Sequence, residues 1–388
     1  MVIYWIMFIY TVVVSFLIET ENKQRKHLLT YQNNTAIQSV GIFGAMVAFL
    51  AIIVLTGVRG HVADTTAYIN AFQMETRSLS DIPALFADFT KVKGPLWIAL
   101  QIVVKNYIYD DVTVMLMLVA AFQGFAVAKI FSRYSDYFTF SSYLFMAGYS
   151  FFWMFNGTRQ FTAVCIILLA SKYLFNQQTK FFVFWVLVAT SFHSTAILCI
   201  IACFIVQGQP FNKKIIWSII IALLCIVFLE QFTGIIDSAL EDTNYNTLEA
   251  GNESEGGMNP LVTLMNAVPL ILVWWRRKFL FTIDRPKYID VIINLSCFNI
   301  GICLIANFTS GITFGRLPIY FTIYNYILLP WIIEKCFFGI DRTIIKFCCI
   351  IFYFAYFLYQ SYGPSSGGVS YSSLYWRFFY ENFSIKLF

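Results

Sequence analysis

The chain has 388 residues, of which 59% are hydrophobic and only 12% charged, and its mean hydropathy is +0.70. This composition excludes an ordinary soluble domain. The net charge of +5 is spread over short loops between apolar segments and forms no basic patch, which argues against nucleic-acid binding. We therefore predict an all-α, polytopic integral membrane protein with one domain over residues 1–388.

Apolar segments close to the length needed to cross a bilayer recur along the chain. They are expected near residues 1–18, 36–56, 94–109, 112–131, 137–155, 160–175, 181–206, 215–229, 260–275, 289–308, 317–334 and 343–360. With one or two of them re-entrant or broken, they predict about 10–12 transmembrane helices. The first segment has no basic residue before it and Lys23, Arg25 and Lys26 after it, which predicts a retained helix with an outer N-terminus.

The basic loops predict which ends of the helices face the cytoplasm. These loops carry Lys23/Arg25/Lys26, Lys129/Arg133, Lys213/Lys214, Arg276/Arg277/Lys278 with Arg285/Lys287, and Lys335/Arg342/Lys346. Loops 57–111 and 230–259 and the tail 361–388 are then expected outside.

Two basic loops on the same side of the membrane must be separated by an even number of crossings. Two of the predicted segments make this number odd. Segment 94–109 is short, begins with Lys93-Gly94-Pro95 and contains Lys105, so we expect a re-entrant or surface helix. Segment 181–206 has His193 at its centre. It is either a pair of half-length helices that meet at 191–195 and return to the same side, or one long tilted helix.

Three polar clusters fall on the predicted outer side. The first contains Arg59, Asp64 and Tyr68, just after the second apolar segment. Asp64 or Thr65 is suited to cap the helix that follows. Two interpretations of Asp64 are open, a cap paired with Arg59 or a group that takes part in chemistry.

The second and third clusters each place an arginine at the start of a helix. Arg159 and Gln160 follow Asn156-Gly-Thr158, where Asn156 or Thr158 is suited to cap the helix, and Arg316 precedes Tyr320 by four residues. A cation in the first turn opposes the helix dipole, which favours an anionic partner. Guanidinium groups bind phosphate oxygens bidentately, so the arginines suit a diphosphate. His193 is either a base, a phosphate ligand or a hydrogen-bonded residue at a helix break.

The nine cysteines lie within or beside apolar segments and do not form paired CxxC motifs. We expect them to fill the core, and we expect no metal and no other cofactor.

The ordered set of clusters resembles the EpsG family of Wzy-type bacterial polysaccharide polymerases. The matching features are Arg59…Asp64-Thr65…Tyr68, then Asn156-Gly-Thr-Arg159-Gln160, then Lys180…Ala189-Thr-Ser-Phe192-His193-Ser194, then Arg316 with Tyr320. The chain departs from the family at Lys93-Gly94-Pro95, where an acidic residue is usual, and this removes the basis for a carboxylate role there.

The resemblance implies a GT-C-like membrane glycosyltransferase that joins oligosaccharide repeat units on undecaprenyl diphosphate into O-antigen, capsule or exopolysaccharide. It implies an active site at the outer, periplasmic face of the bacterial inner membrane. The expected partners are lipid-linked donor and acceptor, membrane lipid and a chain-length regulator protein.

The roles expected of the matching residues follow from that chemistry. Asp64 is the first candidate for the catalytic base and His193 the second. Arg159 and Arg316, assisted by Arg59, are expected to hold the diphosphate. Substrate contacts are also expected at Gln160, Tyr68 and Tyr320.

Two other classes fit part of the pattern. A flippase for the same lipid-linked units would show two related halves, and none are evident. An acyltransferase would account for His193 but would leave the three outer arginines unexplained.

Overall fold

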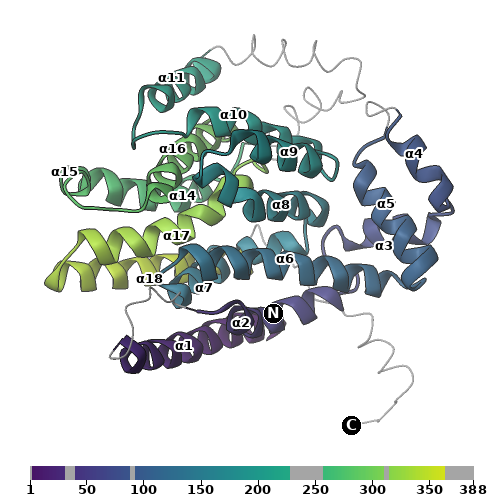
Figure 1. Ribbon diagram of the computed structural model, residues 1–388, viewed down its shortest axis with the longest axis horizontal. Helices are drawn as coiled ribbons and strands as arrows, with labels where there is room; N and C mark the ends of the chain where they lie inside the picture. Colours follow the sequence, from purple (N-terminus) through teal and green to yellow (C-terminus); the bar gives the residue numbers. More distant parts are fainter. Residues whose placement is uncertain (1, 31–39, 88–91, 228–256, 310–313, 363–388) are drawn as a thin grey trace. The chain divides into compact units, whose positions relative to one another are not determined.

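The computed structural model describes residues 2–30, 40–87, 92–227, 257–309 and 314–362, and all regular structure within them is helical. Figure 1 shows the helices of this described part. The predicted all-α class is therefore confirmed. The predicted outer loop 230–259 and tail 361–388 fall almost entirely outside the described residues.

Contacts divide the chain into two compact units that alternate along the sequence. The first contains residues 1–169, 188–194 and 350–388, and the second contains residues 170–187 and 195–349. Because neither unit is one continuous stretch, the division does not cut the chain into consecutive domains, and a single integral domain stays a prediction.

The first half of the chain contributes mainly to the first unit. Its elements are α1 Val2–Thr30, α2 Ile42–Gly57, α3 Thr65–Met74, η1 Leu79–Asp81, α4 Ile82–Leu85, α5 Pro95–Val103, the π-helical η2 Val104–Ile108, α6 Val112–Tyr134, α7 Phe138–Ala147, η3 Ser150–Met154 and α8 Thr158–Phe175.

The second half contributes mainly to the second unit. Its elements are α9 Thr179–Thr190, η4 Ser194–Ile197, α10 Leu198–Ile205, α11 Lys213–Val227, α14 Pro260–Trp275, α15 Arg277–Leu280, α16 Lys287–Phe308, α17 Ile319–Cys336 and α18 Gly339–Tyr362. Helices α8, α9 and α18 have residues in both units.

Four described helices are long and apolar enough to cross a membrane. They are Val2–Gln24 within α1, Val112–Tyr134, Lys287–Phe308 and Gly339–Tyr362. Five shorter apolar helices of 10–17 residues accompany them. These helices suit a polytopic membrane protein, while the number of 10–12 crossings stays a prediction.

Two element boundaries differ from the sequence-based expectation. Helix α1 continues to Thr30, well beyond residue 18, because its Glu, Lys and Gln residues favour helix as strongly as apolar residues do. Segment 137–155 is interrupted after Ala147, where Tyr149 adopts a left-handed φ of 61° that a helix cannot accommodate.

Segment 94–109 forms a helix of 9 residues followed by a π-helical turn. Nine helical residues extend about 14 Å, roughly half of the hydrocarbon thickness. The segment therefore does not cross as a straight helix, in keeping with the predicted re-entrant or surface helix.

Segment 181–206 is two short helices with a break, as the hairpin interpretation predicts. Helix α9 ends at Thr190 and α10 begins at Leu198. Beyond α10, the side-chain Nε2 of Gln207 donates to the carbonyl of Leu174 at 3.0 Å, and Leu174 lies five residues before α9. The end of the pair thus returns to its beginning, and the alternative of one long tilted helix is wrong.

The predicted basic loops gather at one end within each unit. In the first unit, Ser132 Oγ donates to the carbonyl of Val40 at 2.6 Å and the Thr139 amide donates to Glu19 at 2.7 Å. The first bond ties Val40 to the end of α6, which carries Arg133, and the second ties the part of α1 beside Lys23 to the start of α7.

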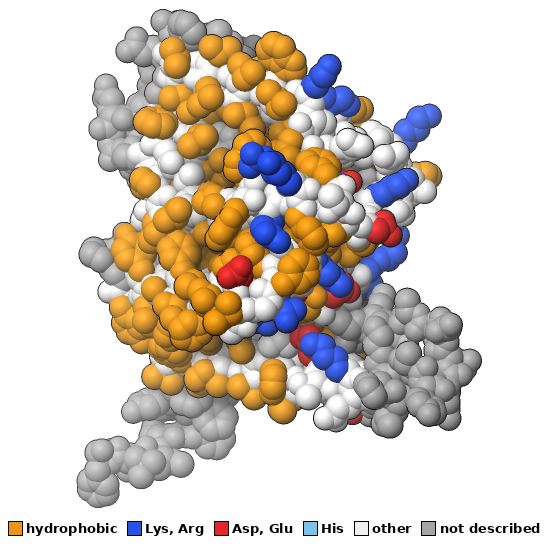
Figure 2. Space-filling view, turned by 90° about the vertical axis from the view of Figure 1, so that its left-hand side faces the viewer, with side chains coloured by type: hydrophobic (Ala, Val, Ile, Leu, Met, Phe, Trp, Pro, Cys, Tyr) orange, Lys and Arg blue, Asp and Glu red, His pale blue; other side chains and the backbone are white. Residues whose placement is uncertain are grey.

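In the second unit, the rings of Phe211 and Trp274 lie 5.6 Å apart and Arg276 Nε donates to the Cys336 carbonyl at 2.8 Å. The basic loops before α11, after α14 and after α17 therefore meet. Figure 2 shows lysine and arginine side chains among hydrophobic ones on the face that carries α15. That this end faces the cytoplasm stays a prediction.

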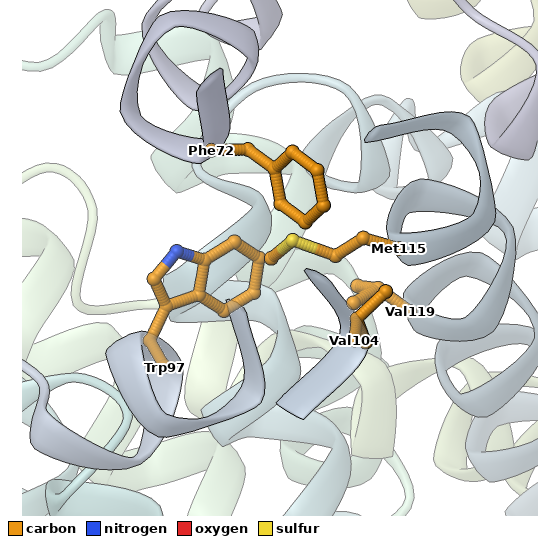
Figure 3. Packing of buried hydrophobic residues seen from close by; sticks show 5 residues of the cluster. All are labelled: Phe72, Trp97, Val104, Met115 and Val119. Atoms are coloured by element: carbon orange, nitrogen blue, oxygen red, sulfur yellow. The ribbon is translucent and has the colours of Figure 1, made fainter. Parts of the chain in front are cut away.

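Helix α5 is fixed to α3 and α6 by a small apolar core. Figure 3 shows Phe72 of α3, Trp97 of α5, Val104 of η2, and Met115 and Val119 of α6 directed toward one another. All five are at most 3% exposed. This packing holds α5 at the end of the first unit opposite its basic loops.

A lysine reinforces this packing. Lys105 Nζ donates to the carbonyls of Phe72, Gln73 and Glu75 at 3.0, 2.9 and 2.7 Å, at the C-terminal end of α3. A cation in that position satisfies carbonyls that a helix leaves unpaired and complements its dipole. Lys105 thus has a structural role.

Candidate functional site

The first two polar clusters meet at the start of α8, inside the first unit. Arg59 is fully buried and joins three segments, because its guanidinium donates to the carbonyl of Thr56 at 2.7 Å, to Thr65 Oγ1 at 2.9 Å and to Thr158 Oγ1 at 2.9 Å. Its guanidinium carbon also lies 5.7 Å from the centre of the Phe155 ring. Arg59 therefore fixes the end of α2 and the start of α3 against the start of α8.

Asp64 is bonded to α8 and not to the helix that it precedes. It occupies the N-cap position of α3 without a side-chain capping bond, and its Oδ2 accepts from the Gly157 amide at 3.1 Å. A carboxylate at a helix N-terminus is favoured by the helix dipole. Gly157 has φ +75° there, and a Cβ would lie 3.0 Å from the Trp153 ring.

The interpretation of Asp64 as a cap of α3 is therefore wrong, because its side chain makes no capping bond, and its pairing with Arg59 stays a prediction. Asp64 and Arg59 each bond to the start of α8, Asp64 at the Gly157 amide and Arg59 at the Thr158 hydroxyl. A helix cap is a local expectation, whereas Gly157, which bonds to Asp64, and Thr158, which bonds to Arg59, lie more than 90 residues away in sequence.

Tyr68 lies one turn beyond Asp64 and touches the same helix start. Its hydroxyl accepts from the Arg159 amide at 3.4 Å, and its ring lies 5.3 Å from that of Trp97. Burial raises the pKa of Tyr68 above its ordinary value. The hydroxyl therefore stays protonated and retains its hydrogen to donate.

Arg159 is half-buried in the first turn of α8, as predicted, and its side chain lies along α5. Its Nη1 donates to the Lys93 carbonyl at 3.3 Å, and its Cδ and Nη1 would each be 3.4 Å from a Cβ at Gly94. Gly94 has φ +74°, and the same Cβ would lie 2.8 Å from the Phe192 carbonyl oxygen. Only glycine permits this approach.

The helix break before His193 is held by α5. The Leu96 amide donates to the Ser191 carbonyl at 3.0 Å, and the His193 amide donates to the Ala189 carbonyl at 3.0 Å. His193 is half-buried. The two segments singled out by the crossing count, 94–109 and 181–206, therefore contact each other beside Arg159.

Gln160, Arg316 and Tyr320 differ in their surroundings. Gln160 is 2% exposed and lies buried in the first turn of α8. Arg316 is half-buried and belongs to the second unit, as does Tyr320, which is fully buried with its hydroxyl 3.1 Å from Thr195 Oγ1. Tyr320 thus supports the chain just after the helix break.

Four residues of the site were not singled out from the sequence. Thr65 and Thr158 were considered only as caps, although both hold Arg59, and Gly94 and Gly157 allow the close approaches. Thr158 is the first residue of α8 and its hydroxyl donates to the Met154 carbonyl at 3.0 Å, so it does not cap the helix. The Asn-Gly and Lys-Gly-Pro sequences are typical of turns and are the signals from which the two glycines were recognisable.

Metal-binding side chains do not cluster in the described part of the chain, where no three His, Cys, Asp or Glu residues are placed to hold an ion. Of the eight cysteines described, seven are buried and Cys348 is exposed. The expected core role is therefore confirmed for those seven.

Comparison with known proteins gives one match. The family model of the EpsG family matches residues 42–373, which include every element described above except α1. No curated protein and no solved structure matches the chain.

Proposed function

Because the chain belongs to the EpsG family of Wzy-type polysaccharide polymerases, we propose that it polymerises oligosaccharide repeat units carried on undecaprenyl diphosphate. The reaction takes place at the outer face of the bacterial inner membrane and yields O-antigen, capsule or exopolysaccharide. A protein that regulates chain length is a further proposed partner. The observation that carries the proposal is the meeting of Asp64, Tyr68 and Arg159 at the start of α8.

In the proposed reaction, a hydroxyl oxygen of the acceptor repeat unit attacks the anomeric carbon of the growing chain. The new glycosidic C–O bond forms as the bond from that carbon to the diphosphate oxygen breaks. The hydroxyl proton passes to a carboxylate, and undecaprenyl diphosphate leaves with the electron pair. The protein must therefore supply a base and stabilise the charge of the leaving group.

Asp64 is our first candidate for the base. The Gly157 amide contacts only Oδ2 and fixes the carboxyl group in place. Among the described residues, Oδ1 has no hydrogen-bond partner that would compete with an acceptor hydroxyl. His193 is the second candidate, since the contact of α5 with Ser191 positions the break that carries it.

Arg159 is our first candidate for the diphosphate. Its single described side-chain bond, to the Lys93 carbonyl, is long at 3.3 Å, so most of its N–H groups remain for phosphate oxygens. Arg316 is the second candidate. Arg59 differs from both, because a fully buried guanidinium with three oxygen partners positions the site and does not touch a substrate.

The test is the polysaccharide ladder of cells whose chromosomal gene carries Arg159→Ala. We expect a loss of about 100-fold in polymerisation, the usual effect of removing one preorganised donor, with single repeat units still displayed. Arg77→Ala is the matched control, since Arg77 is also on the predicted outer side but pairs with Glu75 at 2.7 Å. A normal ladder at normal protein level would refute the role of Arg159.

The two candidate bases are separated by Asp64→Asn and His193→Ala. Loss of the ladder in only one of them identifies the base, and full activity in both refutes the assignment. The product also separates the other classes. Repeat units retained inside the cell would indicate a flippase, and polymer that lacks acyl groups would indicate an acyltransferase.

A further inference from the structure

Helix α5 contains a buried glutamine with an unusual lack of partners. Gln101 is 3% exposed, and its side-chain Nε2 is buried without a hydrogen-bond partner within the described structure. Buried amide groups are nearly always hydrogen-bonded. A donor left in this state requires an explanation, either as a flaw of packing or as a group that bonds to a ligand.

Gln101 lies on the face of α5 that the candidate site uses. It follows Gly94 by seven residues, about two helical turns, so the two positions share a face. Gly94 is the residue that touches the Arg159 side chain and the Phe192 carbonyl. Between them lies Trp97, whose ring packs on Tyr68. The carboxamide is thus about 10 Å along the helix from the Arg159 contact.

A second buried glutamine of the same unit has a structural role and can be compared with Gln101. Gln123 of α6 is fully buried, and its Nε2 donates to the Thr158 carbonyl at 3.0 Å and to Thr162 Oγ1 at 2.9 Å. That side chain joins α6 to α8. Gln101 makes no comparable bond, so its amide does not serve to join helices.

The chemistry of the group indicates what it binds. A carboxamide is neutral and carries both donors and an acceptor, which matches a sugar hydroxyl, whereas the guanidinium of Arg159 matches phosphate. A separation of about 10 Å exceeds the reach of a single diphosphate group held by Arg159, so the carboxamide meets a group attached to that diphosphate. Of the two attached groups, the sugars carry hydroxyl groups and the polyprenyl chain carries none. We propose that Gln101 binds a hydroxyl group of the lipid-linked oligosaccharide, and so contributes to the choice of repeat unit.

This inference rests on the proposed function, and the test separates the two. Purified protein in nanodiscs is titrated with two probes. One is undecaprenyl diphosphate without sugar. The other is the lipid-linked repeat unit extracted from cells that lack the polymerase. Gln101→Met keeps the size of the side chain but removes the amide, and Gln207→Met is the control, since Gln207 lies at the basic end of the second unit.

We expect Gln101→Met to weaken binding of the lipid-linked repeat unit about 10-fold, to leave binding of sugar-free undecaprenyl diphosphate unchanged, and to leave the melting temperature unchanged or raised. Equal weakening of both probes would overturn the assignment to a sugar. Unchanged binding of both, with a raised melting temperature, would show that Gln101 is only a poorly satisfied core residue. If the wild-type protein bound neither probe, the proposed function itself would fail.

Discussion

Replacement of Arg59 by methionine tests whether this arginine is structural, as the geometry indicates, or a substrate ligand, as the sequence suggested. Methionine fills a similar volume but removes the bonds to Thr56, Thr65 and Thr158. Each hydrogen bond of a charged group contributes about 1.5–3 kcal/mol, and breaking a buried network from one side costs about 3–5 kcal/mol in total. This free energy of unfolding is lost because the replaced bonds hold α2, α3 and α8 together.

The measurement is thermal unfolding of the purified protein in detergent, followed by helical circular dichroism. A loss of that size should lower the melting temperature by roughly 10 °C. Arg77→Met provides the control, because Arg77 is 42% exposed and its ion pair with Glu75 should contribute at most about 1 kcal/mol. If Arg59→Met melted like the wild type yet gave no polymer, the structural role would be refuted and direct substrate contact would be favoured.

Three further predictions concern the end of the first unit that carries α3 and α5. Gly94→Ala should abolish polymer formation at near-normal abundance, measured by the ladder and by immunoblot, because a Cβ would press on the Phe192 carbonyl oxygen; a normal ladder would contradict this. Lys105→Met should make α3 more accessible to limited proteolysis, since three carbonyls lose their donor, and an unchanged digestion pattern would argue against the cap. The Arg77 guanidinium lowers the pKa of Glu75 in the folded protein. This pair therefore stabilises the fold at pH values above the pKa of Glu75 in the unfolded chain, and the stabilisation is lost as the pH falls through the lowered pKa of the folded protein. Melting temperatures should therefore fall less steeply below about pH 4.5 in Arg77→Met than in the wild type, and parallel curves would contradict the pair.

The sequence was sufficient for features that depend on local pattern or on charge bias. The lengths of the apolar segments predicted the helices. The crossing count identified segments 94–109 and 181–206 as irregular, and the structure agrees, because α5 is short and the chain breaks after Thr190. It also placed the basic loops at one end within each unit, because a membrane imposes the same bias on every loop.

The pairings within the site were beyond such patterns. Arg59 looked like an outer arginine that assists Arg159 and Arg316, yet it is buried, and one of its neutral acceptors is Thr158, 99 residues later. Asp64 looked like a local cap, and its actual partner is the Gly157 amide. Gln101 carried no signal at all, since a single glutamine in an apolar segment has no recognisable spacing. Such contacts are set by tertiary packing, and the residues that make them follow no fixed spacing in a single sequence.

The bond from the Leu96 amide to the Ser191 carbonyl has a consequence for synthesis of the chain. Its two residues are separated by 95 positions, 191 minus 96. At about 5–20 residues per second, the ribosome needs roughly 5–20 s to make the second partner after the first. During that interval α5 can pack on α3 and α6, but its first turn has no helix break to bind. A nascent chain arrested between α8 and α9 should therefore expose the start of α5 to added protease, and release of the arrest should protect it.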